Sequence, residues 1–143
     1  MILAPAVRTP IAIALGAIAG ALSRYYLGLW LNSWLGTTFP YSTLIINLTG
    51  CFGMGVLATL FLHFLHSDRQ IHPDIHILLT TGFLGSYTTF SSYTLETATL
   101  LQQHLGSALL YWVGSAGLGL LSLSLGMVLT KRVLQSCFAV LFK

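Results

Sequence analysis

The sequence predicts an all-α integral membrane protein with four transmembrane helices, the third of which is broken in mid-membrane. Of its 143 residues, 55% are hydrophobic and only 6% are charged, and the mean hydropathy is +0.83. A soluble domain would carry roughly 25% charged residues. At about 20 apolar residues per span, the chain has room for four helices and short loops. Residues 1–143 are therefore interpreted as one transmembrane domain.

The first helix is predicted over about 10–31, with Pro10 at a helix start, where its missing N–H is tolerated. Gly16 and Gly20 lie four residues apart and form a small-residue face for close helix packing. Arg24 lies in the second half of this helix. It either snorkels to the interface or faces a water-filled vestibule, where it attracts anions or braces a neighbouring helix end.

A loop over 32–40 leads to the second helix, predicted over about 41–64. Asn47 is a polar residue in an otherwise apolar stretch, IINLTGCFGMG. An amide is unfavourable in lipid, so we expect Asn47 to bond another helix or a permeating species.

The third helix is predicted over about 74–103, after a polar loop at 66–74. It is longer than a straight span requires, and a break around Gly85 to Thr88 accounts for the excess. Seven hydroxyl-bearing residues occupy the eight positions 86–93. A single Ser or Thr in a helix usually donates a hydrogen bond to a carbonyl one turn earlier. Such back-bonding does not by itself explain seven hydroxyl-bearing residues beside two glycines. The break is therefore the predicted working site.

The fourth helix is predicted over about 107–130, where Tyr111 and Ser115 lie one turn apart. The remaining VLQSCFAVLFK is too short to span and is expected to lie along the interface.

The residues favour ion conduction over catalysis. The chain has three carboxylates, of which only Glu96 is expected within the membrane, and it offers no nucleophile–base pair or metal-ligand set. Neutral hydroxyls, an amide and aromatic ring edges can replace the hydration shell of a small anion without holding it too tightly. Carbonyls freed at the break suit a small cation instead. The net charge of +3 is too small to indicate a nucleic-acid partner.

Three segments resemble the Fluc (CrcB) family of bacterial fluoride channels. They are GAIAGALSRYYL at 16–27, TLIINLTGCFGMG at 43–55 and GFLGSYTTFSSYTLE at 82–96, the last being close to the family's GFxGGxTTFSTF motif. The resemblance implies an antiparallel, dual-topology dimer of four-helix chains in the bacterial inner membrane. It also implies two fluoride pores per dimer and a central structural sodium ion. Passive export of cytoplasmic fluoride and contact with membrane lipid follow from the same resemblance.

The resemblance also implies roles for individual residues. The carbonyls of Gly85 and Thr88 would hold sodium together with those of the dimer mate. The fluoride pore would be lined by an aromatic box, by polar groups of the second, third and fourth helices, and near its vestibule by an arginine. These residues are Asn47, Phe90, Tyr93, Thr89, Ser91, Ser92, Glu96, Tyr111, Ser115 and Arg24.

Two residues depart from the family pattern. Tyr93 stands where the second phenylalanine of the box is usual, so a hydroxyl donor either modifies its ring-edge contact or removes it. Ser86 replaces a glycine at the break. Whether Glu96 acts as a charge or as a structural hydrogen-bonding group is left open by the sequence.

Charge distribution bears on the dimer partner. With four spans, both termini and the 66–74 loop share one side of the membrane, and five of the six Lys and Arg residues lie there. The positive-inside rule then places both termini in the cytoplasm. A dual-topology chain should show little such bias. The bias therefore adds an alternative for the dimer partner: it is either a second copy of the chain or an oppositely oriented homologue.

Three other classes of protein compete with a channel. A small multidrug exporter needs a carboxylate in its first helix, and this chain has none there. A structural subunit of a membrane complex would move no ion. A membrane enzyme is disfavoured because catalytic groups are lacking.

Overall fold

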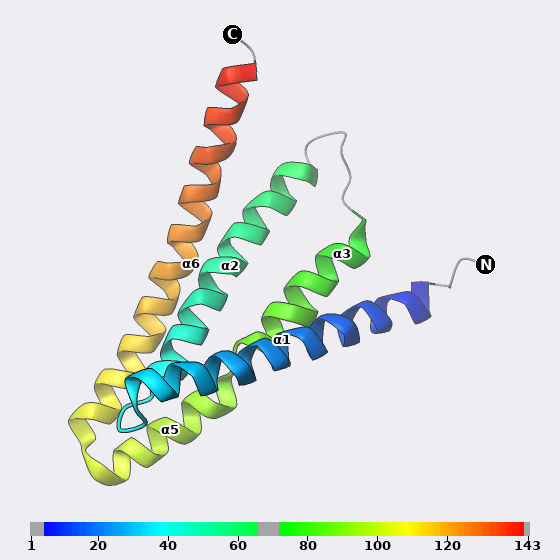
Figure 1. Ribbon diagram of the computed structural model, residues 1–143. Helices are drawn as coiled ribbons and strands as arrows, with labels where there is room; N and C mark the ends of the chain where they lie inside the picture. Colours follow the sequence, from blue (N-terminus) through cyan, green and yellow to red (C-terminus); the bar gives the residue numbers. More distant parts are fainter. Residues whose placement is uncertain (1–4, 66–71, 142–143) are drawn as a thin grey trace.

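The computed structural model describes residues 5–65 and 72–141, and every element in these ranges is helical (Figure 1). The described residues form three long helices and one interrupted segment. The long helices are α1 (Pro5–Leu35), α2 (Tyr41–Leu65) and α6 (Leu105–Leu141). The interrupted segment lies between α2 and α6 and consists of α3 (Pro73–Ile77), the π-helix η1 (Leu78–Leu84), α4 (Gly85–Tyr87) and α5 (Phe90–Gln103).

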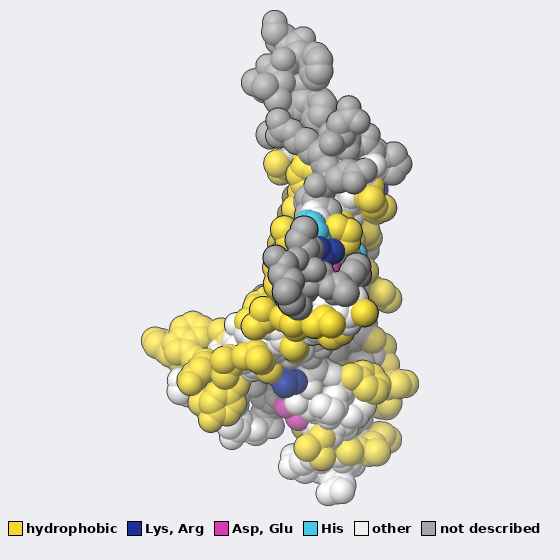
Figure 2. Space-filling model, turned by 90° about the vertical axis from the view of Figure 1, so that its right-hand side faces the viewer, with side chains coloured by type: hydrophobic (Ala, Val, Ile, Leu, Met, Phe, Trp, Pro, Cys, Tyr) yellow, Lys and Arg dark blue, Asp and Glu magenta, His cyan; other side chains and the backbone are white. Residues whose placement is uncertain are grey.

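Three of the helices in the described ranges, α1, α2 and α6, are long and apolar enough to cross a membrane. The predicted third span corresponds to the interrupted segment from α3 to α5, in which no single helix exceeds 14 residues. On the face shown in Figure 2, most of the coloured side chains are hydrophobic, and the charged ones occupy small areas. Large apolar side chains are exposed along α1 and α6, as expected for helices that face lipid.

The helix bounds differ from the predicted ones mainly at the ends of the chain. Helix α1 runs over Pro5–Leu35 rather than 10–31, so Pro10 lies inside it and not at its start. One missing backbone donor is tolerated because only a single ladder bond is lost. At the other end, Gly36 adopts φ +75° and its N–H bonds the Asn32 carbonyl at 3.0 Å, which ends the helix.

Helix α6 runs to Leu141, so the prediction that the last residues form a separate interfacial segment is wrong. No glycine or proline follows Gly126, and nothing in the sequence therefore stops the helix at 130. Its 37 residues correspond to about 55 Å of helix, well beyond a hydrocarbon core of about 30 Å. Figure 1 shows α6 extending past the end of α2.

Glycines bring the helices into close contact at two places. A Cβ at Gly16 or Gly20 of α1 would collide with the carbonyl oxygens of Leu78 and Phe83, so the predicted small-residue face is the contact between α1 and η1. Gly55 and Gly126 play the same part between α2 and α6, where each faces a carbonyl of the other helix. Backbones that touch in this way gain dispersion contacts, which drive helix association in lipid.

A charged contact ties the start of α1 to the start of α3. The Arg8 guanidinium pairs with the Asp74 carboxylate, which also accepts a hydrogen bond from Thr9 at 3.4 Å. Asp74 lies in the first turn of α3, where a negative charge is favoured by the helix dipole. The sequence places it at the end of the polar loop 66–74, of which residues 66–71 lie outside the described ranges.

We expect Gly20→Ala to lower the thermal stability of the detergent-solubilised protein, because the added methyl group must displace the Phe83 carbonyl. Gly28→Ala is the matched control on the same helix, since its Cβ would meet only the Ile46 side chain at 3.8 Å. Both changes gain the same helix propensity, so the difference isolates overpacking, about 1–3 kcal/mol. Equal melting curves by circular dichroism would contradict this packing.

Candidate functional site

The third span breaks at Thr88 and Thr89, at the end of the predicted interval Gly85 to Thr88. Thr88 has ψ 156° and Thr89 has φ −143°, both extended rather than helical. Before the break, the backbone N–H and the hydroxyl of Thr88 both donate to the Leu84 carbonyl, at 3.0 and 2.9 Å. The preceding π-helix η1 was not predicted; π-helical turns are frequent at functional sites.

Asn47 of α2 supplies the hydrogen bonds that the break removes. Its Nδ2 donates to the Thr89 carbonyl at 3.1 Å, and its Oδ1 accepts from the Thr89 N–H at 2.9 Å. One side-chain amide therefore pairs with both backbone groups of the extended residue. The sequence left two partners open for Asn47, another helix or a permeating species. The structure shows a bond to the third span, at the residue that caps α5.

Thr89 also begins the next helix. Its Oγ1 accepts a hydrogen bond from the Ser92 N–H at 3.1 Å, which is the standard N-cap contact for α5. The hydroxyls of Ser91 and Ser92 lie within 3.2 and 3.1 Å of the same oxygen. Three of the predicted pore hydroxyls thus form one cluster at the positive end of the α5 dipole.

Two hollows meet at the break. One is an open groove of about 570 Å³ on the α1 side, lined by Arg24, Gly85, Ser86, Thr88, Thr89, Phe90, Ser91 and residues of α1. The other is an apolar cavity of about 380 Å³ between α2, α5 and α6. Its lining includes Asn47, Cys51, Phe90, Tyr93 and Ser115. Thr88, Thr89 and Phe90 line both and so separate them.

Aromatic rings continue from the cavity along α5 and α6. The ring centroids of Phe90 and Tyr93 are 5.8 Å apart, and those of Tyr93 and Tyr111 are 5.4 Å apart. Phe90 is 77% exposed, whereas Tyr93 is 9% and Tyr111 only 2% exposed. The two residues predicted to form the aromatic box are therefore neighbours, one of them exposed and the other buried.

Glu96 ends this line of rings and is held by two hydroxyls. Thr43 of α2 donates to Oε1 at 2.6 Å, and Tyr111 of α6 donates to Oε2 at 2.7 Å. Glu96 also lines a third hollow, of about 260 Å³, with Asn32, Gln103 and residues of the 36–40 loop. Hydroxyl bonds this short are strong when the acceptor is a carboxylate, so the two donors fix the position of Glu96.

Ser115 carries the one unsatisfied hydroxyl of the cavity. Its Oγ is buried and has no hydrogen-bond partner among the described residues. A buried hydroxyl without a partner is unfavourable unless a ligand or water meets it. Arg24, by contrast, faces the groove on the far side of the break and is partly exposed.

The structure brings ten of the twelve predicted site residues into one continuous line and adds Thr43, which the sequence analysis missed. Gly85 and Arg24 lie off that line, on the groove. Thr43 precedes Asn47 by four residues and therefore shares its helix face, a spacing that could have indicated it.

Comparison with known proteins identifies the family of the chain. A family profile described as "CrcB-like protein, Camphor Resistance (CrcB)" matches residues 11–127. The chain belongs to the CrcB family. Among its relatives is a protein named fluoride-specific ion channel FluC from Trichormus variabilis, 52% identical over 92% of this chain and 94% of the relative. A protein of the same name from a Synechococcus species is 50% identical over 89% and 95%.

Membership of the CrcB family confirms the predicted resemblance and the predicted class, an all-α integral membrane protein. The chain is a multi-pass protein of a bacterial membrane. The matched region spans the break and all the site residues from Arg24 to Ser115. It leaves out residues 128–143, which include the end of α6.

We expect Asn47→Ala to destabilise the protein by about 1–3 kcal/mol, because it leaves a backbone N–H and a carbonyl unpaired. Ser124→Ala is the control: that exposed hydroxyl only bonds back to the Leu120 carbonyl of its own helix. Thermal unfolding in detergent measures both. A melting temperature of Asn47→Ala equal to that of the control would show that Thr89 does not depend on the amide.

Proposed function

We propose that this chain forms a fluoride-selective channel through which cytoplasmic fluoride leaves the cell passively. The relatives named above carry the name of a fluoride-specific ion channel. They describe a channel and not an enzyme, which confirms the expectation that the chain does not catalyse a reaction. The observation that carries the proposal is the line of neutral donors and aromatic rings that runs from the break to Glu96.

This line suits a small, strongly hydrated anion. Hydroxyls and ring edges can replace hydrating water without the tight hold of a fixed positive charge, as conduction requires. The unpaired Ser115 hydroxyl offers a donor inside the apolar cavity. Farther on, the hydroxyls of Thr43 and Tyr111 point at Glu96, so an anion that arrives there competes with a carboxylate for the same donors.

Passive conduction is sufficient for export. Hydrogen fluoride is a weak acid that enters an acidified cell as the neutral molecule and dissociates inside. The trapped anion then runs down its own gradient through an open path. No energy-coupling group is needed, in keeping with the single carboxylate in the proposed path.

We further propose an antiparallel dimer with two pores and a central sodium ion. The groove that holds Gly85 and Thr88 is open, and Phe90 beside it is 77% exposed. One chain supplies two backbone carbonyls there, too few for a cation that is held by oxygen alone. Hard, neutral oxygens fit sodium in kind, and an inverted second chain would double their number. Bound sodium would add structural positive charge, while Arg24 would attract anions to the groove.

The partner is either a second copy or an oppositely oriented homologue. The charge bias supports the latter, because five of the six Lys and Arg residues lie on the side of the two termini. Attaching a topology reporter to the C-terminus tests this choice. We expect a signal from the cytoplasm alone if the partner is a homologue, whereas equal signals from both sides would establish dual topology and a homodimer.

The function is tested with liposomes that contain only the purified chain. We expect an ion-selective electrode to record rapid fluoride release while chloride is retained. If no fluoride is released, the same assay with a co-expressed homologue of opposite topology separates a half-channel from a structural subunit. A chain that releases neither ion in either preparation is not a channel.

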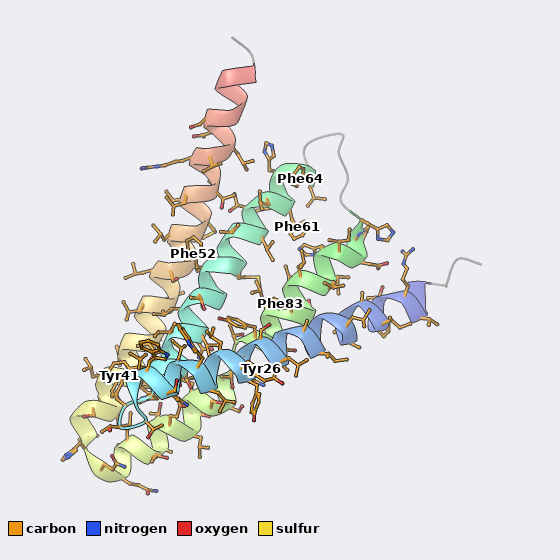
Figure 3. All side chains as sticks on the ribbon, in the orientation of Figure 1. Tyr26, Tyr41, Phe52, Phe61, Phe64 and Phe83 are labelled. Atoms are coloured by element: carbon orange, nitrogen blue, oxygen red, sulfur yellow. The ribbon has the colours of Figure 1, made fainter. Side chains whose placement is uncertain are left out.

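We expect Phe90→Ile to reduce fluoride release by at least tenfold, because it removes the exposed ring between groove and cavity. Phe64→Ile makes the same substitution at the far end of α2 (Figure 3) and should leave release unchanged. The electrode assay compares the variants at equal protein-to-lipid ratio. Unchanged release through Phe90→Ile would remove this ring from the path.

A further inference from the structure

Tyr93 ties α5 to α6 through its hydroxyl. The O–H donates to the backbone carbonyl of Trp112 at 2.7 Å. The side chain is 9% exposed, and its ring packs against those of Phe90 and Tyr111. A phenylalanine at this position could make the ring contacts but not the bond to α6.

The hydroxyl is bonded to a residue outside the lining of the cavity. Tyr93 lines the apolar cavity, but Trp112, whose backbone carbonyl accepts its hydrogen bond, does not. A tyrosine hydroxyl can donate one hydrogen bond, and here it donates to that carbonyl. At Tyr93 the cavity is therefore lined by an aromatic ring. The tyrosine O–H, which could otherwise bind an anion directly, is hydrogen-bonded to α6.

This bond is one half of a two-point brace. Tyr93 and Glu96 are three residues apart on α5, and they bond Trp112 and Tyr111, which are adjacent on α6. The covalent link between the two helices is the single residue His104. Two bonds about one turn apart fix both the spacing and the tilt of α5 against α6, whereas the Glu96 contact alone would act as a pivot.

We propose that Tyr93 is a positioning residue for ion selectivity: its hydroxyl clamps α5 to α6 and thereby sets the width of the cavity beside its ring. The inference rests on the proposed fluoride channel and adds a role that the ring alone does not give. Movement of α5 away from α6 would widen the space beside the ring. Loosening the clamp admits chloride, which is larger and more weakly hydrated.

The test compares Tyr93→Phe with Tyr93→4-aminophenylalanine, whose N–H can still donate to Trp112. Tyr26→Phe is the matched control, because Tyr26 lies on α1 and is 65% exposed (Figure 3). Fluoride and chloride release from liposomes are measured for each variant, with size-exclusion profiles to verify assembly. Release is measured with whichever partner the wild-type chain needs.

We expect Tyr93→Phe to raise the ratio of chloride to fluoride release about two- to tenfold, the range that corresponds to one lost hydrogen bond. The 4-aminophenylalanine variant should restore the wild-type ratio, and Tyr26→Phe should not change it. A merely structural bond would lower the melting temperature without changing this ratio.

Each other result counts against the proposal. A wild-type ratio in assembled Tyr93→Phe overturns the clamp and leaves the channel intact. If Tyr93→Phe does not assemble, an altered ratio in the 4-aminophenylalanine variant overturns it as well, because the donor is present there. A wild-type chain that releases no fluoride with any partner overturns both the channel and the clamp.

Discussion

The bond between the Asn47 amide and the backbone of Thr89 is the contact on which the rest of the site depends. In lipid an unpaired N–H or carbonyl costs several kcal/mol, so a helix can open there only where another group replaces its ladder. Asn47 replaces both bonds at one residue. With the backbone fixed at this point, Thr89 caps α5, and the direction of α5 places Tyr93 and Glu96 against α6.

How far the sequence could predict this site varies from residue to residue. The break was predictable because two glycines and seven hydroxyls in a membrane span are hard to accommodate in an unbroken helix that faces lipid. Its exact position at Thr88 and Thr89 was harder to predict, because the π-helix before it shifts the helical register. The partner of Asn47 depends on how α2 packs against the third span, and no local pattern encodes that distance.

Helix ends show the same limit. Leucines and valines continue past residue 130 without a breaker, and only an assumed membrane thickness suggested a stop there. The tertiary contact of Tyr93 could not be predicted from the sequence either. Its position in the aromatic box left two alternatives, a ring-edge contact modified by the hydroxyl or a ring-edge contact that is lost. The structure shows where the hydroxyl goes: it donates to the Trp112 carbonyl of α6, and the ring packs against that of Tyr111.

The geometry of the break also bears on the proposed dimer. A polar groove that contains an arginine and several hydroxyl groups is unfavourable where it faces lipid. The cavity on the α6 side is also open to the surface, and among the described residues that line it the buried Ser115 hydroxyl is the one without a hydrogen-bond partner. This chain alone holds Tyr93 against α6, through the Trp112 carbonyl. In the proposed dimer, a neighbour would cover the groove on the other side and add oxygen donors at the break.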